Sequence, residues 1–251
     1  MIYYFSGTGN SLMVCKLLAK ELQDDYSAIV SPKMCMDSTI GLIFPVYAWG
    51  MPKIVENFII NTLPTICQDK SCYFYIVMTC GDDIGYADKL VSKAMKKIGI
   101  NLTSIFSVQM PNTYVSLPGF DVDSKKLAYQ KISMMKKNIF NISNTIKNCE
   151  KDTKITRGKF PWLKSYLLRP LFNKFFMSDK RFWVEKTCIC CGKCAKHCPM
   201  KNIEIGNKGG NFSFVWKKHC EGCMGCYHIC PMHAIQYWCF TRHKGQKDIF
   251  S

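Results

Sequence analysis

Cysteines with a repeated spacing are the clearest chemical signal in this 251-residue sequence. Eight of them form two copies of the pattern Cys-x2-Cys-x2-Cys-x3-Cys-Pro, and the second copy lies 32 residues after the first. Such spacing places three thiolates around one iron–sulfur cube and sends the fourth to a second cube. The sequence therefore predicts two 4Fe-4S clusters. Their expected metal ligands are Cys188, Cys191, Cys194 and Cys230 for one cluster, and Cys220, Cys223, Cys226 and Cys198 for the other.

A pair of structural zinc sites is the alternative, because zinc also takes four thiolates from Cys-x2-Cys pairs. Evenly spaced triplets closed by Cys-Pro favour iron–sulfur. Cys190 falls inside the first motif, but using it would break the match to the second motif, so it is expected not to be a ligand. The remaining cysteines are interpreted as small buried apolar residues: Cys15, Cys35, Cys67, Cys72, Cys80, Cys149 and Cys239.

The elements before the cysteine motifs follow an α/β pattern, in which short apolar runs alternate with stretches of helical period. Strands are expected near residues 1–5, 28–30, 40–45, 72–79 and 105–109, and helices near 11–23, 52–62 and 86–98. This order predicts a doubly wound, five-stranded parallel sheet. Ligands of such sheets bind beyond the carboxyl ends of the strands, so the loops after the first, third and fourth strands are expected to form one site.

The three loops contain the residue types that a phosphorylated, flat heterocycle requires. Glycines, hydroxyls and a helix N-terminus in the first loop suit a monophosphate, and the aromatic residues of the second could pack on a ring. An ordinary strand-to-helix turn and core aromatics are the alternatives. The expected cofactor-binding residues are Ser6, Gly7, Thr8, Gly9, Asn10, Ser11, Pro45, Val46, Tyr47, Ala48, Trp49, Gly50, Thr79, Cys80, Gly81, Asp82 and Gly85.

On these three loops the first module resembles a flavodoxin. The resemblance implies a non-covalently bound FMN whose ring lies between the second and third loops, with Tyr47 or Trp49 on one face. With the cysteine motifs and the segment 110–114, the whole chain resembles the flavodoxin/ferredoxin fusion proteins of anaerobic bacteria and archaea. That family implies a flavodoxin-like FMN domain joined to a small α+β bacterial-type ferredoxin domain with two 4Fe-4S clusters.

The resemblance implies electron transfer between FMN, the two clusters and redox partner proteins in anaerobic metabolism. The alternative is an FMN-dependent oxidoreductase, which would use NAD(P)H or a small substrate at the flavin and receive electrons from its ferredoxin domain. The sequence contains no recognisable Ser-His-Asp set, carboxylate pair or nucleoside-triphosphate loop, so no side chain is expected to be catalytic. Any enzymatic chemistry would belong to the cofactors.

Composition divides the chain into residues 1–150 (FMN domain), 151–183 (basic, aromatic connector), 184–240 (ferredoxin domain) and 241–251 (tail). The connector is interpreted as an amphipathic arm packed between the modules, ahead of membrane-surface contact and of nucleic-acid binding. Nearly all of the net charge of +16 lies after residue 121. It favours an acidic redox partner, such as a ferredoxin, over nucleic acid. A cytoplasmic chain is expected, since no leader or apolar run of about 18 residues is present.

Overall fold

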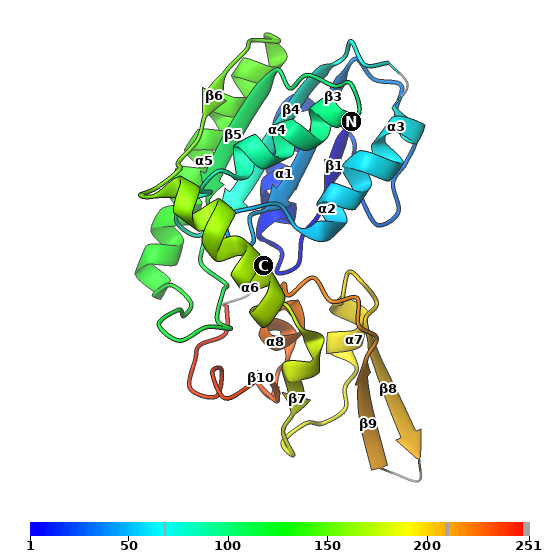
Figure 1. The fold of residues 1–251 in the computed structure, drawn as a ribbon, viewed down its shortest axis with the longest axis vertical. Coiled ribbons are helices and arrows are strands. Elements are labelled where there is room, and N and C mark those ends of the chain that lie inside the picture. The colour runs from blue at the N-terminus through cyan, green and yellow to red at the C-terminus, as the bar shows by residue number, and fades with distance from the viewer. Residues whose placement is uncertain (68, 209–210, 248–251) are drawn as a thin grey trace.

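The computed structural model describes residues 1–67, 69–208 and 211–247, which form two units linked by a helical connector (Figure 1). The larger unit, coloured blue to green, is a sheet with helices on both faces. The smaller unit lies beyond the carboxyl ends of the strands and carries the two cysteine motifs. No helix in the described part of the chain has the length and apolar content to cross a membrane.

The sheet has six parallel strands in the order β2-β1-β3-β4-β5-β6. They are β1 (Ile2–Tyr4), β2 (Tyr26–Ala28), β3 (Thr39–Pro45), β4 (Tyr73–Cys80), β5 (Ser104–Gln109) and β6 (Thr153–Lys154). The first five follow the order 2-1-3-4-5 of flavodoxin-like folds. The predicted flavodoxin-like α/β fold is confirmed, with one strand more than expected. β6 was missed because its two exposed residues have no apolar pattern and pair only with Ile105 and Phe106.

Two helical layers cover the sheet because the side chains of each strand alternate between its faces. Leu42 and Phe44 of β3 pack toward one layer, whereas Ile43 between them packs toward the other. The first layer contains α2 (Lys53–Asn57), the π-helical turn η1 (Phe58–Thr62), α3 (Leu63–Ile66) and α4 (Ala87–Lys97). The second contains α1 (Asn10–Leu22) and α5 (Lys125–Lys147).

The smaller unit has its own core, built around Phe182, Tyr227 and Tyr237. Its two short helices lie within the cysteine motifs and carry the third cysteine of each, and its strands form an antiparallel pair and a hairpin. The elements are β7 (Phe182–Val184) with β10 (Ile235–Tyr237), α7 (Lys193–His197), α8 (Gly225–Ile229), and the hairpin of β8 (Ile203–Lys208) and β9 (Asn211–Trp216). Val115 of the larger unit is part of this core, so the units share a packed interface.

The connector contains η2 (Leu163–Leu168), α6 (Arg169–Phe176) and η3 (Asp179–Arg181), and it contacts both units. The Ser165 hydroxyl donates to the Trp49 carbonyl (2.9 Å), and the Tyr237 hydroxyl donates to the Phe176 carbonyl (2.8 Å). These contacts agree with the packed-arm interpretation. The expectation that its large aromatic residues are buried is only partly correct. Phe160 and Trp162 are 73% and 61% exposed, because only one side of the arm faces the protein.

Candidate functional site

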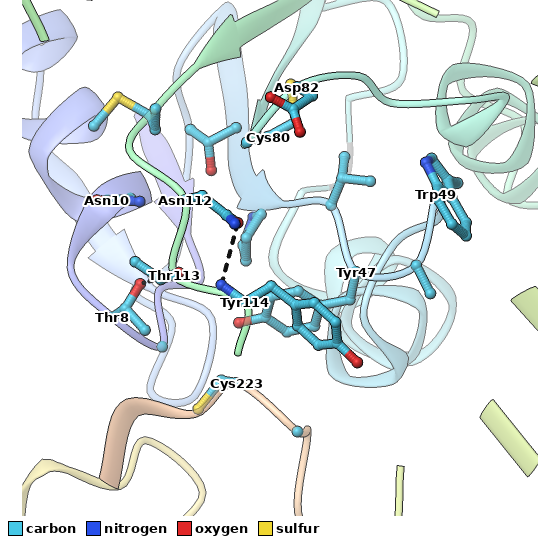
Figure 2. Close-up of a pocket in the computed structure, with 18 of the residues that line it drawn as sticks. Thr8, Asn10, Tyr47, Trp49, Cys80, Asp82, Asn112, Thr113, Tyr114 and Cys223 are labelled. Atoms are coloured by element: carbon cyan, nitrogen blue, oxygen red, sulfur yellow. Dashed lines mark hydrogen bonds between the residues drawn. The ribbon is translucent and has the colours of Figure 1, made fainter. Parts of the chain in front are cut away.

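A cavity of about 400 Å³ lies at the carboxyl ends of β1, β3 and β4, where the sequence predicted a site (Figure 2). Small-molecule sites typically measure about 300–1,000 Å³. Most of the predicted cofactor residues line the cavity: Ser6, Gly7, Thr8, Asn10, Ser11, Pro45, Val46, Tyr47, Ala48, Trp49, Thr79, Cys80, Gly81 and Asp82. The three loops therefore converge on one space.

Three predicted glycines do not line the cavity, and each of them instead shapes the backbone of its loop. Gly9 takes φ 92° and turns the chain into α1. Gly50 packs so closely against the Arg169 side chain that an added Cβ would lie 2.6 Å from Cδ. Gly85 takes φ 55° beside Ser165 and Trp49. The structure gives all three a role in loop shape, and their contact with a cofactor stays a prediction.

Side-chain hydroxyls fix the loop of residues 6–11 above the N-terminus of α1. The Ser6 hydroxyl accepts from the Gly9 amide (3.1 Å), and the Ser11 and Thr79 hydroxyls lie 2.7 Å apart. The amides at the beginning of a helix have no partner within the helix and carry its positive dipole end. This loop consequently fits an anion such as a phosphate monoester.

The second loop is a tight turn that presents two aromatic side chains. Tyr47 and Gly50 exchange two backbone hydrogen bonds, while Ala48 and Trp49 between them both take positive φ. Such a conformation is strained for residues other than glycine, so neighbouring contacts must hold it. The connector does so: Ser165 bonds to Trp49, and Arg169 donates to the Met51 carbonyl (2.9 Å).

Several residues that line the cavity were not predicted: Asp83, Met110, Pro111, Asn112, Thr113, Tyr114, Leu117, Phe120, Lys164, Phe172, Met177, Gly222 and Cys223. Tyr114 contacts Phe120 and Phe172 edge to face, with ring centroids 5.6 and 5.7 Å apart. Its hydroxyl is buried without a well-formed hydrogen bond, although Ser116 lies close. The position of segment 110–114, directly after a parallel strand, was the signal that could have placed it in the site.

The third loop is held by a buried ion pair from α5. The Lys131 ammonium lies 2.7 Å from the Asp123 carboxylate and donates to the Gly81 carbonyl (2.9 Å). Asp123 also accepts from the Asn112 amide (2.9 Å), so one pair positions two loops of the cavity. In the same loop, burial raises the pKa of the Cys80 thiol to about 12, which makes it an apolar wall rather than a nucleophile.

Lys131→Met is expected to lower the free energy of unfolding by about 3–5 kcal/mol, because it leaves the Asp123 carboxylate buried without its partner. Only 10% and 12% of the two side chains is exposed. Chemical denaturation measures the loss, and Lys136→Met, an exposed lysine on the same helix, is the control. Equal stability of the two variants would contradict the positioning role of Lys131.

The two cysteine motifs adopt the same backbone conformation 32 residues apart. Cys190 and Gly222, Gly192 and Met224, and Lys201 and His233 all take positive φ. Backbone amides donate to the same sulfurs in both copies: Cys190 to Cys188, Gly222 to Cys220, Asn202 to Cys198 and Ala234 to Cys230, at 3.2–3.4 Å. Amide donors to sulfur stabilise thiolates that hold an iron–sulfur cluster.

The fourth cysteine of each motif lies with the other motif. Burial raises the pKa of the Cys226 thiol, and the neighbouring thiols of Cys223, Cys220 and Cys198, and then of Cys194, raise it further. Burial likewise raises the pKa of Cys194, with Cys230 and Cys188 as neighbours. Within the described ranges, no three His, Cys, Asp or Glu side chains converge on the position of a single metal ion. The two sets of four thiols and their amide donors fit the predicted exchange of ligands between clusters.

The cavity and the second cysteine set meet at Gly7. A Cβ on Gly7 would lie 2.8 Å from the Cys223 sulfur, and a Cβ on Gly225 would lie 2.5 Å from the Gly7 carbonyl. A ring nitrogen of His197 lies 3.0 Å from the same carbonyl. Figure 2 shows Cys223 beside the loop that carries Thr8. The loop of residues 6–11, the phosphate-type loop, is thus in direct contact with a predicted cluster ligand.

Comparison with known proteins gave one family match: residues 182–237 match the 4Fe-4S dicluster domain. The search of curated proteins gave no match. Similar solved structures include rubredoxin oxygen:oxidoreductase from Desulfovibrio gigas (11% identity, 59% of this chain, TM-score 0.39), of which this chain spans only 36%. A short-chain flavodoxin is 13% identical over 57% of this chain and 96% of its own (TM-score 0.36), and a flavone reductase is 12% identical over 92% and 85% (TM-score 0.38).

Because these identities and TM-scores are low, the assignment of the first unit depends on its strand order. That order and the family match define a chain with a flavodoxin-like domain followed by a 4Fe-4S dicluster domain. The dicluster domain implies two iron–sulfur clusters, and its combination with this fold indicates a role in redox chemistry or electron transfer.

Proposed function

We propose that the protein is an electron carrier that binds FMN in the cavity and 4Fe-4S clusters at the two cysteine sets, and that passes electrons on to partner proteins. The observation that carries the proposal is the dual position of Cys223, which is a predicted cluster ligand and also lines the cavity. When bound, a flavin exchanges one or two electrons, whereas each cluster exchanges one. Direct contact between the two sites suits a protein that joins these two kinds of transfer.

The contact between Cys223 and the cavity also indicates which of the two cysteine sets lies nearer to the flavin in the path of the electrons. The set with Cys223 is proximal to the cavity, so the set with Cys194 is distal. Cys191 of the distal set is exposed, as are Lys186, Lys193 and Lys196 around it. We propose this rim as the docking face for an acidic redox partner such as a ferredoxin, since opposite charge guides association.

Side chains from outside the three loops would help to hold the proposed flavin. Phe172 and Met177 of the connector, together with Tyr114 and Phe120, also line the cavity. Lys164 closes a further side through its ion pair with Asp83 (2.6 Å). Tyr47, Trp49 and Tyr114 are the aromatic side chains available to pack on a flat ring within this enclosure.

Anaerobic purification followed by quantification of iron, sulfide, zinc and flavin tests this proposal. We expect about eight iron, eight sulfide and one FMN per chain, as two four-iron clusters require. Zinc in place of iron would overturn the cluster assignment. Reduction of the bound flavin by NADH or NADPH at a catalytic rate would instead favour the FMN-dependent oxidoreductase.

A further inference from the structure

Lys247 comes from the segment that the sequence assigned to a C-terminal tail, yet the structure packs it against the phosphate-type loop. Its ammonium donates to the Thr8 carbonyl (2.9 Å) and to the Asn10 side-chain oxygen (2.7 Å). The position is fixed from the other side, because the Lys247 amide donates to a ring nitrogen of His228 (3.0 Å). Gln246, the preceding residue, donates to the Tyr227 carbonyl (2.6 Å). This segment therefore packs directly against a loop that lines the cavity.

The ammonium of Lys247 is partly buried and has no anionic partner among the described residues. No Asp or Glu carboxylate of the described residues pairs with it. Burial lowers the pKa of its ammonium to about 8, with no opposing contribution from a carboxylate. A partly buried cation that bonds only to neutral oxygens costs stability, so an anion that binds nearby would relieve that cost.

The surroundings of Lys247 specify the kind of anion. Its ammonium lies 3.8 Å from the position of a Cβ on Gly9, at the N-terminus of α1, where amides and the hydroxyls of Ser6, Thr8 and Ser11 gather. Amide and hydroxyl donors together with one ammonium match a phosphate monoester, which has three acceptor oxygens and about −1.5 to −2 charges. Lys247 would complete the donor set of the loop with a full positive charge.

We propose that Lys247 pairs with the phosphate of the bound flavin and makes the site selective for FMN over riboflavin. This inference rests on the proposed function, because it takes FMN as the occupant of the cavity. This pairing also gives a reason why the segment 241–247 folds back onto the flavodoxin-like domain. By doing so, the segment brings a cation from the dicluster domain to the phosphate-type loop.

The test compares the affinities of full-length Lys247→Met and wild type for FMN and for riboflavin, measured anaerobically by flavin fluorescence. FMN should bind roughly ten- to hundredfold more weakly to the variant, as expected for the loss of a charge-assisted hydrogen bond. Riboflavin, which has no phosphate, should bind equally to both. The flavin-free variant should also melt at a higher temperature than wild type, because an unpaired buried charge has been removed.

Lys244→Met is the matched control from the same segment. Lys244 donates to the Val115 and Leu117 carbonyls and does not touch the phosphate-type loop. Its loss should lower the melting temperature and affect both flavins alike. Equal weakening of FMN and riboflavin by Lys247→Met, or no weakening of either, would overturn the Lys247 proposal. Failure of wild type to bind any flavin would instead overturn the proposed function.

Discussion

Replacing Cys226 by alanine is expected to interrupt electron transfer between the flavin and the remaining cluster. Cys226 lies in the proximal set with Cys223, Cys220 and Cys198, between the cavity and the distal set. The variant should lose about four of eight iron atoms, since three thiolates of that set no longer complete a cluster. Anaerobic stopped-flow spectroscopy would record the absorbance of the flavin and of the remaining cluster separately. Reduction of the flavin should no longer lead to reduction of the cluster.

Cys194→Ala is the matched control, because Cys194 occupies the equivalent position in the other motif. This variant should also lose about four iron atoms, but electron transfer between the flavin and the proximal cluster should stay fast. Instead, transfer to an external acceptor protein should slow, because the distal set with the exposed Cys191 has lost its cluster. Fast reduction of the remaining cluster in Cys226→Ala would refute the proposed order.

Gly7→Ala is expected to push the two domains apart where Gly7 contacts Cys223. The new methyl group would overlap Cys223 and lie 2.9 Å from the Tyr47 hydroxyl, so the backbone or the dicluster domain must shift. Overpacking of this kind typically costs about 1–3 kcal/mol. We expect a lower melting temperature, weaker FMN binding and slower flavin-to-cluster transfer, measured on one anaerobic preparation.

Gly81→Ala is the control for that variant. Its added Cβ would lie 3.1 Å from the Asn112 side-chain oxygen, a milder approach than that at Gly7, and none of its nearest atoms belongs to the dicluster domain. The variant should therefore keep its flavin-to-cluster transfer. If Gly7→Ala behaves like Gly81→Ala in all three measurements, the contact between Gly7 and Cys223 has no part in coupling the sites.

The features that were predictable from sequence are those set by short stretches of chain. The cysteine motifs fold locally, so their repeat of 32 residues appears again in their φ angles and in their amide-to-sulfur bonds. The three loops were found because each directly follows an apolar strand of a parallel sheet, and the topology of that sheet fixes where the strands end.

The features that were missed depend on how distant segments dock. Phe172, Met177 and Cys223 line the cavity only because the connector and the dicluster domain pack against the flavodoxin-like domain. No periodicity in the sequence encodes that docking. The same limit explains Phe160 and Trp162: composition suggested burial, but which side of the arm faces the protein is decided by contacts such as that of Ser165 with Trp49.

The contact between residues 6–11 and the dicluster domain sets an order for maturation. A ribosome delivers the phosphate-type loop before residues 222–247. The nascent flavodoxin-like domain can fold its sheet early, but its cavity lacks Gly222 and Cys223, and its loop lacks the contact with Lys247, until those later residues have been made and have docked. If FMN is the occupant of the cavity, as proposed, we expect it to bind firmly only after the cysteine-rich segment has docked on the first domain.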